Sequence, residues 1–161
     1  MSRTNKKKTK FLAGFSGVFS LNKESCNLGL RSKYNFSYFV DNQEHCTGLT
    51  DHQYANEILD IMVKLRDFSK KSLMELKSDS TLIIYKDFPS HSEFNRPKHI
   101  PHDVLWGRFR LSGKARLVGF VIPDEFHNQA YHANSQLYLC KNTFYIVFID
   151  LEHKFYPVMR K

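Results

Sequence analysis

The basic residues between positions 104 and 122 have the types and spacing of a binding site for an anion. The segment VLWGRFRLSGKARLVGFVI contains Arg108, Arg110, Lys114 and Arg116 and no acidic residue. Guanidinium groups donate paired hydrogen bonds to phosphate oxygens. The segment therefore predicts contact with a polyanion. The alternative is a solvated basic surface that only keeps the protein soluble.

The register of a β-hairpin decides whether these arginines can act together. Ser-Gly at 112–113 lies between two strand-like runs, which predicts a hairpin turn there. A two-residue loop would put Arg116 on the opposite face from Arg108 and Arg110. A three-residue loop, 112–114, pairs Arg110 with Arg116 and brings all three arginines to one face.

We favour the three-residue loop because of what it leaves on the other face. That face then has no charge and consists of Leu105, Phe109, Leu111, Ala115, Leu117 and Val121. A sheet that buries one face requires this separation. Trp106 shares the arginine face, where it either stacks on a nucleobase or packs in the core. The loop also places Lys114 at its third position, which is often left-handed and suits glycine better.

A second group of candidate residues follows the last predicted strand. The run TFYIVFID, 143–150, is apolar on both faces, as is typical of a central strand, and His153, Lys154 and Tyr156 come directly after it. We interpret this strand end as a candidate site. We expect His153 or Tyr156 to lie near the arginines of the hairpin. The alternative is a chain that is simply leaving its core.

The rest of the chain predicts the elements that hold these groups. Apolar residues at helical spacing predict a helix over about 51–68 and a shorter one over about 73–78. Their starts fit capping boxes, which are Thr50 with Gln53 and Ser72 with Glu75. Two further stretches are typical of strands, 34–40 and 81–88.

Composition indicates one folded domain with a basic N-terminus. The 161 residues are 42% hydrophobic and carry a net charge of +8. Five of the basic residues lie in positions 1–10, and the rest of the chain has 19 basic and 16 acidic residues. We therefore expect a flexible basic tail over 1–12 and a single α+β domain over 13–161.

Cysteine and histidine placement bears on compartment and on metal binding. The three cysteines are widely spaced and form no CxxC pair, so we expect free thiols in a cytoplasmic protein. His91, His99 and His102 lie in a proline-rich loop and suggest zinc. Their spacing is loose and Pro101 interrupts it, so we expect no metal and no other cofactor. No apolar run has the ~20 residues of a membrane-spanning helix, so no membrane partner is expected.

The pattern RFRLSGKARLVGFVI, then FYIVFID, then HKFY, resembles the C-terminal half of the RelE/ParE-like toxin superfamily. The order of strand, two helices and antiparallel strands over 34–157 is also similar. The resemblance implies a small α+β fold with a twisted, mostly antiparallel sheet and two helices from the N-terminal half on one face. The chain departs from the family pattern in its N-terminal extension and in its long 123–136 connection.

The resemblance also implies an activity and partners. RelE-like toxins are endoribonucleases that cleave mRNA, typically on the ribosome, through the substrate's own 2′-hydroxyl and without a metal. Carried over, the resemblance makes Arg108, Arg110 and Arg116 phosphate-binding and transition-state groups, and His153 and Tyr156 proton-transfer groups. It makes Lys154 an RNA contact, and Lys114 either a further phosphate-binding group or only a loop residue. A cognate antitoxin protein would be a further partner of such a toxin–antitoxin system. ParE relatives share the fold but poison gyrase, so a protein-binding toxin or phage-defence accessory is one alternative. A non-catalytic nucleic-acid-binding module is the other.

Overall fold

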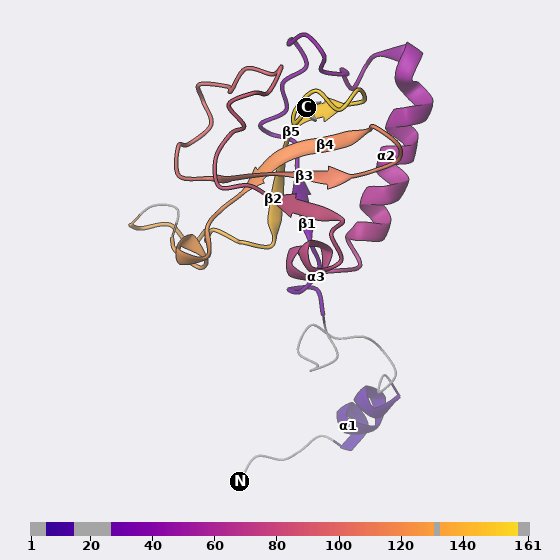
Figure 1. Cartoon of the computed structure of the whole chain (residues 1–161). Helices are drawn as coiled ribbons and strands as arrows, with labels where there is room; N and C mark the ends of the chain where they lie inside the picture. Colours follow the sequence, from indigo (N-terminus) through magenta and orange to yellow (C-terminus); the bar gives the residue numbers. More distant parts are fainter. Residues whose placement is uncertain (1–5, 15–26, 131–132, 158–161) are drawn as a thin grey trace.

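A five-stranded mixed sheet forms the centre of the protein in the computed structural model, which describes residues 6–14, 27–130 and 133–157 (Figure 1). Its strands are β1 (Lys33–Asn35), β2 (Leu82–Ile84), β3 (Leu105–Arg110), β4 (Arg116–Val121) and β5 (Thr143–Asp150). They lie in the order β1-β5-β4-β3-β2. The edge strand β1 runs parallel to β5, and the other neighbours are antiparallel. The predicted α+β class is confirmed, as is the mostly antiparallel pairing.

The described residues form three α-helices, α1 (Lys6–Ala13), α2 (Ala55–Phe68) and α3 (Leu73–Ser78). Single turns of 3₁₀-helix occupy His52–Tyr54, before α2, and Asp124–Phe126, after β4. The two helices predicted from apolar spacing are therefore confirmed. No helix of the described residues is long and apolar enough to cross a membrane. Residues 1–5 of the expected flexible tail lie outside the described residues, and 6–13 form α1.

The local sequence explains where the helices begin. At α3 the Ser72 side chain accepts from the Glu75 amide, and the Glu75 carboxylate accepts from the Ser72 amide at 2.7 Å. This is the predicted capping box. The other predicted box is wrong by one residue, because Asp51, not Thr50, accepts from the Gln53 amide at the turn before α2. A carboxylate reaches the free amides of a first turn as well as a hydroxyl does.

The helices α2 and α3 cover one face of the sheet (Figure 1). Ile61 and Leu65 of α2 and Leu73 and Leu76 of α3 are buried against it. The sheet contributes Leu82, Phe109, Leu117, Val121, Phe144, Ile146 and Ile149 to this first core. The charge-free face predicted for the hairpin is thus confirmed as the face that the helices bury.

Loops cover the other face of the sheet. Segments 85–104 and 151–157 supply buried side chains to a second core, which is mainly aromatic. Its fully or nearly fully buried members are Phe94, Ile100, Val104, Trp106, Val118, Phe120, Val147, Phe148 and Phe155. Because both faces are covered, β5 must be apolar on both sides, as its sequence predicted.

The hairpin between β3 and β4 has the predicted register. Arg110 pairs with Arg116, and Leu111 donates to the Ala115 carbonyl across a three-residue loop. The left-handed residue in that loop is Gly113, with a φ of 51°, so the expectation of a left-handed Lys114 is wrong. Glycine takes this backbone conformation without a Cβ clash, which is why the sequence tolerates the loop.

The strand predicted over 34–40 is mostly absent, because only Lys33–Asn35 pairs with β5. Asn35 then accepts from the Ser37 amide at 2.8 Å, and Phe36 accepts from the Phe39 amide at 3.0 Å. These two turn contacts take the chain out of the sheet. The alternation of aromatic residues had suggested a longer strand, but short polar side chains that bind nearby amides end it.

Candidate functional site

The end of β5 brings His153 directly against the arginine hairpin. The Arg108 Nη1 atom lies 2.6 Å from His153 Nε2. Arg108 is buried, with 8% of its surface exposed. The predicted convergence of the two basic segments is therefore present in the fold, although they are 45 residues apart in sequence.

This contact defines the protonation state of His153. A guanidinium group has only donors, so His153 Nε2 must be the acceptor. The imidazole is then neutral and carries its proton on Nδ1. Burial, and then the charges of Arg108 and Arg116, lower the pKa of His153 from its usual value, in the same direction. The site thus holds a neutral imidazole beside a buried cation.

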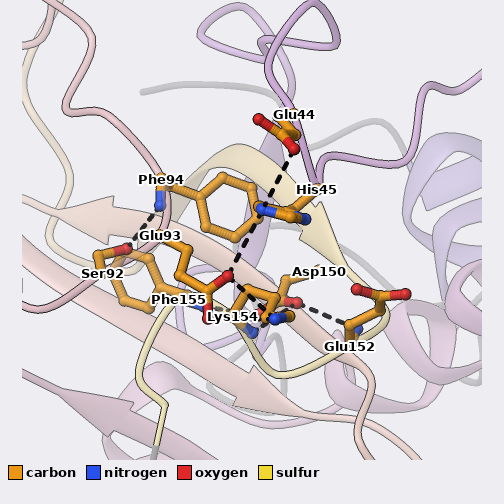
Figure 2. A network of polar contacts seen from close by, with 9 residues as sticks. All are labelled: Glu44, His45, Ser92, Glu93, Phe94, Asp150, Glu152, Lys154 and Phe155. Carbon is orange, nitrogen blue, oxygen red and sulfur yellow. Dashed lines mark hydrogen bonds and ion pairs between the residues drawn. The ribbon is translucent and has the colours of Figure 1, made fainter.

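Asp150 holds the backbone that carries this histidine. Its carboxylate is fully buried and accepts the amides of Glu152, Lys154 and Phe155 at 3.1, 3.0 and 2.9 Å (Figure 2). His153 itself has a φ of 65°, which is uncommon for a residue other than glycine. Three bonds to one buried carboxylate therefore fix a turn in which the imidazole is aimed at Arg108.

Lys154 ties this turn to the loop of residues 85–104. Its ammonium group binds both carboxylate oxygens of Glu93 at 3.1 and 2.9 Å, and its carbonyl accepts the Glu93 amide at 3.1 Å. His45 Nε2 lies 3.5 Å from the same carboxylate (Figure 2). The side chain that the resemblance assigns to RNA binding is thus engaged by an acid, and the Glu93 bond is the main reason that the pKa of Lys154 is raised.

Two stacked tyrosines lie beside Arg108. The rings of Tyr85 and Tyr156 are 5.0 Å apart and nearly parallel, at 5°. The Arg108 Cζ atom is 5.9 Å from the Tyr85 centroid and 5.6 Å from that of Tyr156. His91 packs against Tyr156, at 4.6 Å between ring centroids and 75° between planes. The guanidinium group is therefore attracted by the tyrosine rings as well as by the imidazole.

Arg116 completes a cluster of like charges. Its Nη1 donates to the carbonyls of Gly113 and Ala115 at 2.9 and 2.7 Å. Burial, and then the nearby charges of Arg108 and Arg110, lower the pKa of Arg116. Arginines directly across a strand pair repel each other. Their close approach indicates a position where an anion would relieve that repulsion.

The cluster has unused donors. The Nε atoms of Arg108 and Arg116 are buried and have no hydrogen-bond partner among the described residues. No carboxylate of the described ranges forms an ion pair with Arg108, Arg110 or Arg116. Buried polar groups are normally satisfied, so unsatisfied ones require an explanation. Several guanidinium donors without acid partners suit a phosphate group.

The remaining predicted residues divide into exposed and buried ones. Arg110 and Lys114 are exposed at the open end of the hairpin. Trp106 is 1% exposed and packs against Phe88, Phe120 and Phe155. Trp106 therefore belongs to the second core. Packing in the core was one of the two interpretations that its position in the sequence allowed.

Sequence reasoning missed three residues of the site. Tyr85 follows β2, and its amide donates to the Trp106 carbonyl, which puts it on the arginine face. Its pKa is raised mainly by burial. Asp150 ends β5, where a buried carboxylate followed by an irregular segment is a usable signal of a turn. His91 was considered only as a zinc ligand.

The three loop histidines have separate neighbours. His91 contacts Tyr156, His99 stacks on Tyr38, and His102 Nδ1 lies 2.9 Å from Arg96 Nη1. No group of three or more His, Cys, Asp or Glu residues in the described part of the chain could hold a metal ion. Cys46 and Cys140 are free and half-buried, and Cys26 lies outside the described residues.

Comparison with known proteins identifies no relative. No family model matches the chain, and no curated protein and no solved structure matches it. The function must therefore be argued from the geometry of the site.

Proposed function

We propose that this protein is an endoribonuclease that cleaves RNA by attack of the substrate's own 2′-hydroxyl, without a metal. The observation that carries the proposal is the contact of buried Arg108 with the neutral imidazole of His153, beside Tyr156. This combination joins a phosphate-binding cation to a proton acceptor. A scaffold that only grips phosphate has no need of a base held in its unprotonated form.

The contact suggests how substrate binding activates the base. A phosphodiester oxygen that takes the Arg108 N–H replaces His153 Nε2 as the acceptor. The freed lone pair can then accept the proton of a 2′-hydroxyl. The phosphate charge also offsets the arginine charges that lower the pKa of His153, so the imidazole becomes a better base when substrate is present.

The proposed reaction makes one bond to the scissile phosphorus and breaks another. The 2′-oxygen forms a bond to phosphorus as its proton passes to His153, and the bond to the 5′-oxygen breaks. The leaving oxygen takes a proton from an acid, for which Tyr156 is the candidate predicted from sequence. The products are a 2′,3′-cyclic phosphate and a 5′-hydroxyl. Arg108, Arg110 and Arg116 stabilise the additional negative charge of the transition state.

The proposal includes the family resemblance. A RelE-like fold, an mRNA substrate taken on the ribosome, a cytoplasmic location and an antitoxin partner belong to it as parts of a toxin–antitoxin system. What supports this part is the order of the elements and the position of HKFY after an internal strand. Lys114 and Arg110 are suited to contact RNA next to the scissile phosphate, since both are exposed on the hairpin.

The test is cleavage of a short labelled RNA by purified protein in buffer with EDTA. The wild type is expected to release products that end in a 2′,3′-cyclic phosphate, both on free RNA and on programmed ribosomes. Arg108→Ala should slow cleavage by about 10²–10³-fold, as removal of one transition-state donor does. His153→Asn should slow it by about 10²–10⁴-fold, because asparagine keeps the left-handed turn but is no base.

The matched control is Arg66→Ala, which removes an exposed arginine from α2 on the other side of the sheet. It should cleave at the wild-type rate. RNA binding that falls steeply with salt but gives no cleaved product would overturn the nuclease and leave a binding module. Binding to a protein partner that is insensitive to RNA and salt would instead favour the protein-binding alternative.

A further inference from the structure

The general acid of the proposed reaction is not settled by the sequence, which offered only Tyr156 beside the base His153. The aromatic cluster at the site contains a second imidazole, His91, which the resemblance does not assign. Two imidazoles near one phosphate-binding group are suited to paired proton transfers, one as base and one as acid.

We propose that His91 is the general acid and protonates the leaving 5′-oxygen. This inference rests on the proposed ribonuclease activity. The ring of Tyr156 contacts both partners, since His91 lies 4.6 Å from its centroid and Arg108 Cζ lies 5.6 Å from it. A phosphate bound by Arg108 would then have His153 at the same guanidinium group and His91 at the tyrosine ring that this guanidinium group contacts.

The fold holds the two histidines on loops that are bound to each other. His91 is in the turn that Ser92 closes with its amide on the Pro89 carbonyl at 3.2 Å. The neighbouring Glu93 receives the Lys154 ammonium group and donates its own amide to the Lys154 carbonyl (Figure 2). Lys154 directly follows His153. The spacing of the two imidazoles is therefore set by contacts one or two residues from each.

His91 is also free to act. Its side chain is exposed, and neither ring nitrogen has a hydrogen bond from the residues that the structure describes. The other proton donors are less suitable. An imidazolium group is a more effective proton donor to a leaving oxygen at neutral pH than a phenol is. The Lys154 ammonium group is held by Glu93.

The step balances without any additional reactant. The proton of the 2′-hydroxyl passes to His153 Nε2 as the bond from the 2′-oxygen to phosphorus forms. The bond from phosphorus to the 5′-oxygen breaks with its electron pair on oxygen, and the imidazolium proton of His91 passes to that oxygen. Tyr156 remains a neutral ring that packs on Tyr85 and orients His91 and Arg108.

The test uses two RNA substrates that differ at one atom. In the second, sulfur replaces the bridging 5′-oxygen, and a thiolate leaves without protonation. His91→Ala should slow cleavage of the oxygen substrate by about 10²–10⁴-fold and cleave the sulfur substrate within about tenfold of wild type. His153→Asn should stay slow on both. A purely structural defect would affect both substrates equally.

Controls separate the possible outcomes. His52→Ala, an exposed histidine before α2, should match wild type on both substrates. Tyr156→Phe should change the rates on the two substrates by the same factor, because the ring remains and its hydroxyl does not protonate the leaving oxygen. If Tyr156→Phe is the variant that sulfur rescues, or if His91→Ala is unaffected or equally slow on both substrates, His91 is not the acid. His91→Gln serves as a second variant with its melting temperature as a folding check. Failure of the wild type to cleave either substrate would overturn the ribonuclease proposal, and with it the role of His91.

Discussion

The two faces of the sheet are covered by different kinds of structure, and this difference explains where the candidate site lies. On one face, α2 and α3 pack aliphatic side chains against Phe109, Leu117 and Phe144. On the other, the loops 85–104 and 151–157 pack aromatic side chains against Trp106 and Phe148. A helix satisfies its own backbone hydrogen bonds, whereas a loop that covers a core must find partners for its amides.

Those partners are polar side chains buried on the loop-covered face. Asp150 accepts three amides there, and Glu93 and Lys154 join the two loops. The buried Arg108 is on this face as well, with no carboxylate paired to it among the described residues. Arg108 and Asp150 are the buried charged residues of the described part of the chain, and the core on the helix face contains neither. Charged side chains of the candidate site can therefore lie on the loop-covered face without disturbing the core that the helices form.

The largest contrast is expected between two neighbours in β3 that point to opposite faces, Phe109 and Arg108. Phe109→Ala empties a fully buried site and should lower the free energy of unfolding by about 3–5 kcal/mol. Arg108→Met keeps the volume and removes a buried, unpaired charge, so stability should be unchanged or higher. Urea denaturation measures both. A loss for Arg108→Met as large as that for Phe109→Ala would mean that the arginine cluster is structural.

A loss of stability of similar size is expected at Asp150, the carboxylate that holds the turn on the loop-covered face. Asp150→Ala leaves the amides of Glu152, Lys154 and Phe155 without an acceptor, each at about 1–3 kcal/mol when buried. Asp150→Asn retains one carbonyl oxygen and should lose less. Denaturation gives the totals, and amide hydrogen exchange should accelerate at these three positions. Unchanged exchange there would contradict a role for Asp150 in holding the turn.

A smaller effect is expected from the titration of His153. Its pKa is lowered by burial and by Arg108 and Arg116, so the unfolded chain binds a proton more readily than the folded protein. Stability should therefore fall as pH decreases below about 6.5 and be unaffected by this group above that value. Denaturation between pH 7.5 and 5.5 should show less pH dependence in His153→Asn. An imidazole pKa at or above 6.5 by NMR would contradict this prediction.

The smallest effect is expected at Lys114, which is exposed in the hairpin loop. Lys114→Ala should change stability by no more than about 0.5 kcal/mol. If the loop contacts RNA, the slope of log affinity against log salt should become shallower by about 1. Filter binding at several salt concentrations measures the slope, with Lys70→Ala on the helix side as the matched control. Equal slopes for the two variants would exclude Lys114 from the RNA contact.

Much of this architecture was predictable because it depends on residues close in sequence. The Ser72 and Glu75 capping box and the register of the hairpin follow from local spacing and from the need to bury an uncharged face. The limits of β1 were predicted less well. Asn35 ends that strand through a side-chain contact, and a pattern of aromatic residues does not reveal such a contact.

The candidate site was only partly predictable, for a similar reason. Its arginines and His153 carry chemical types that can be recognised in sequence, and their convergence follows if β5 lies beside the hairpin. Tyr85 and His91 come from a loop without periodicity. Only the packing of 85–104 onto the sheet brings Tyr85 to Arg108 and His91 to Tyr156. Lys154 was expected to be free for RNA, but Glu93, 61 residues away, engages it.

The amino-acid sequence alone was sufficient to place three arginines on one face of a hairpin and a histidine after an internal strand. Alternation of side chains along a strand and the burial of one face are local constraints, and they leave few alternatives. Which groups meet those arginines depended on the tertiary structure. Contacts between loops far apart in the chain arise from shape, burial and backbone hydrogen bonding in the whole fold, and so Asp150, Tyr85 and His91 acquired their places only when the sheet was covered.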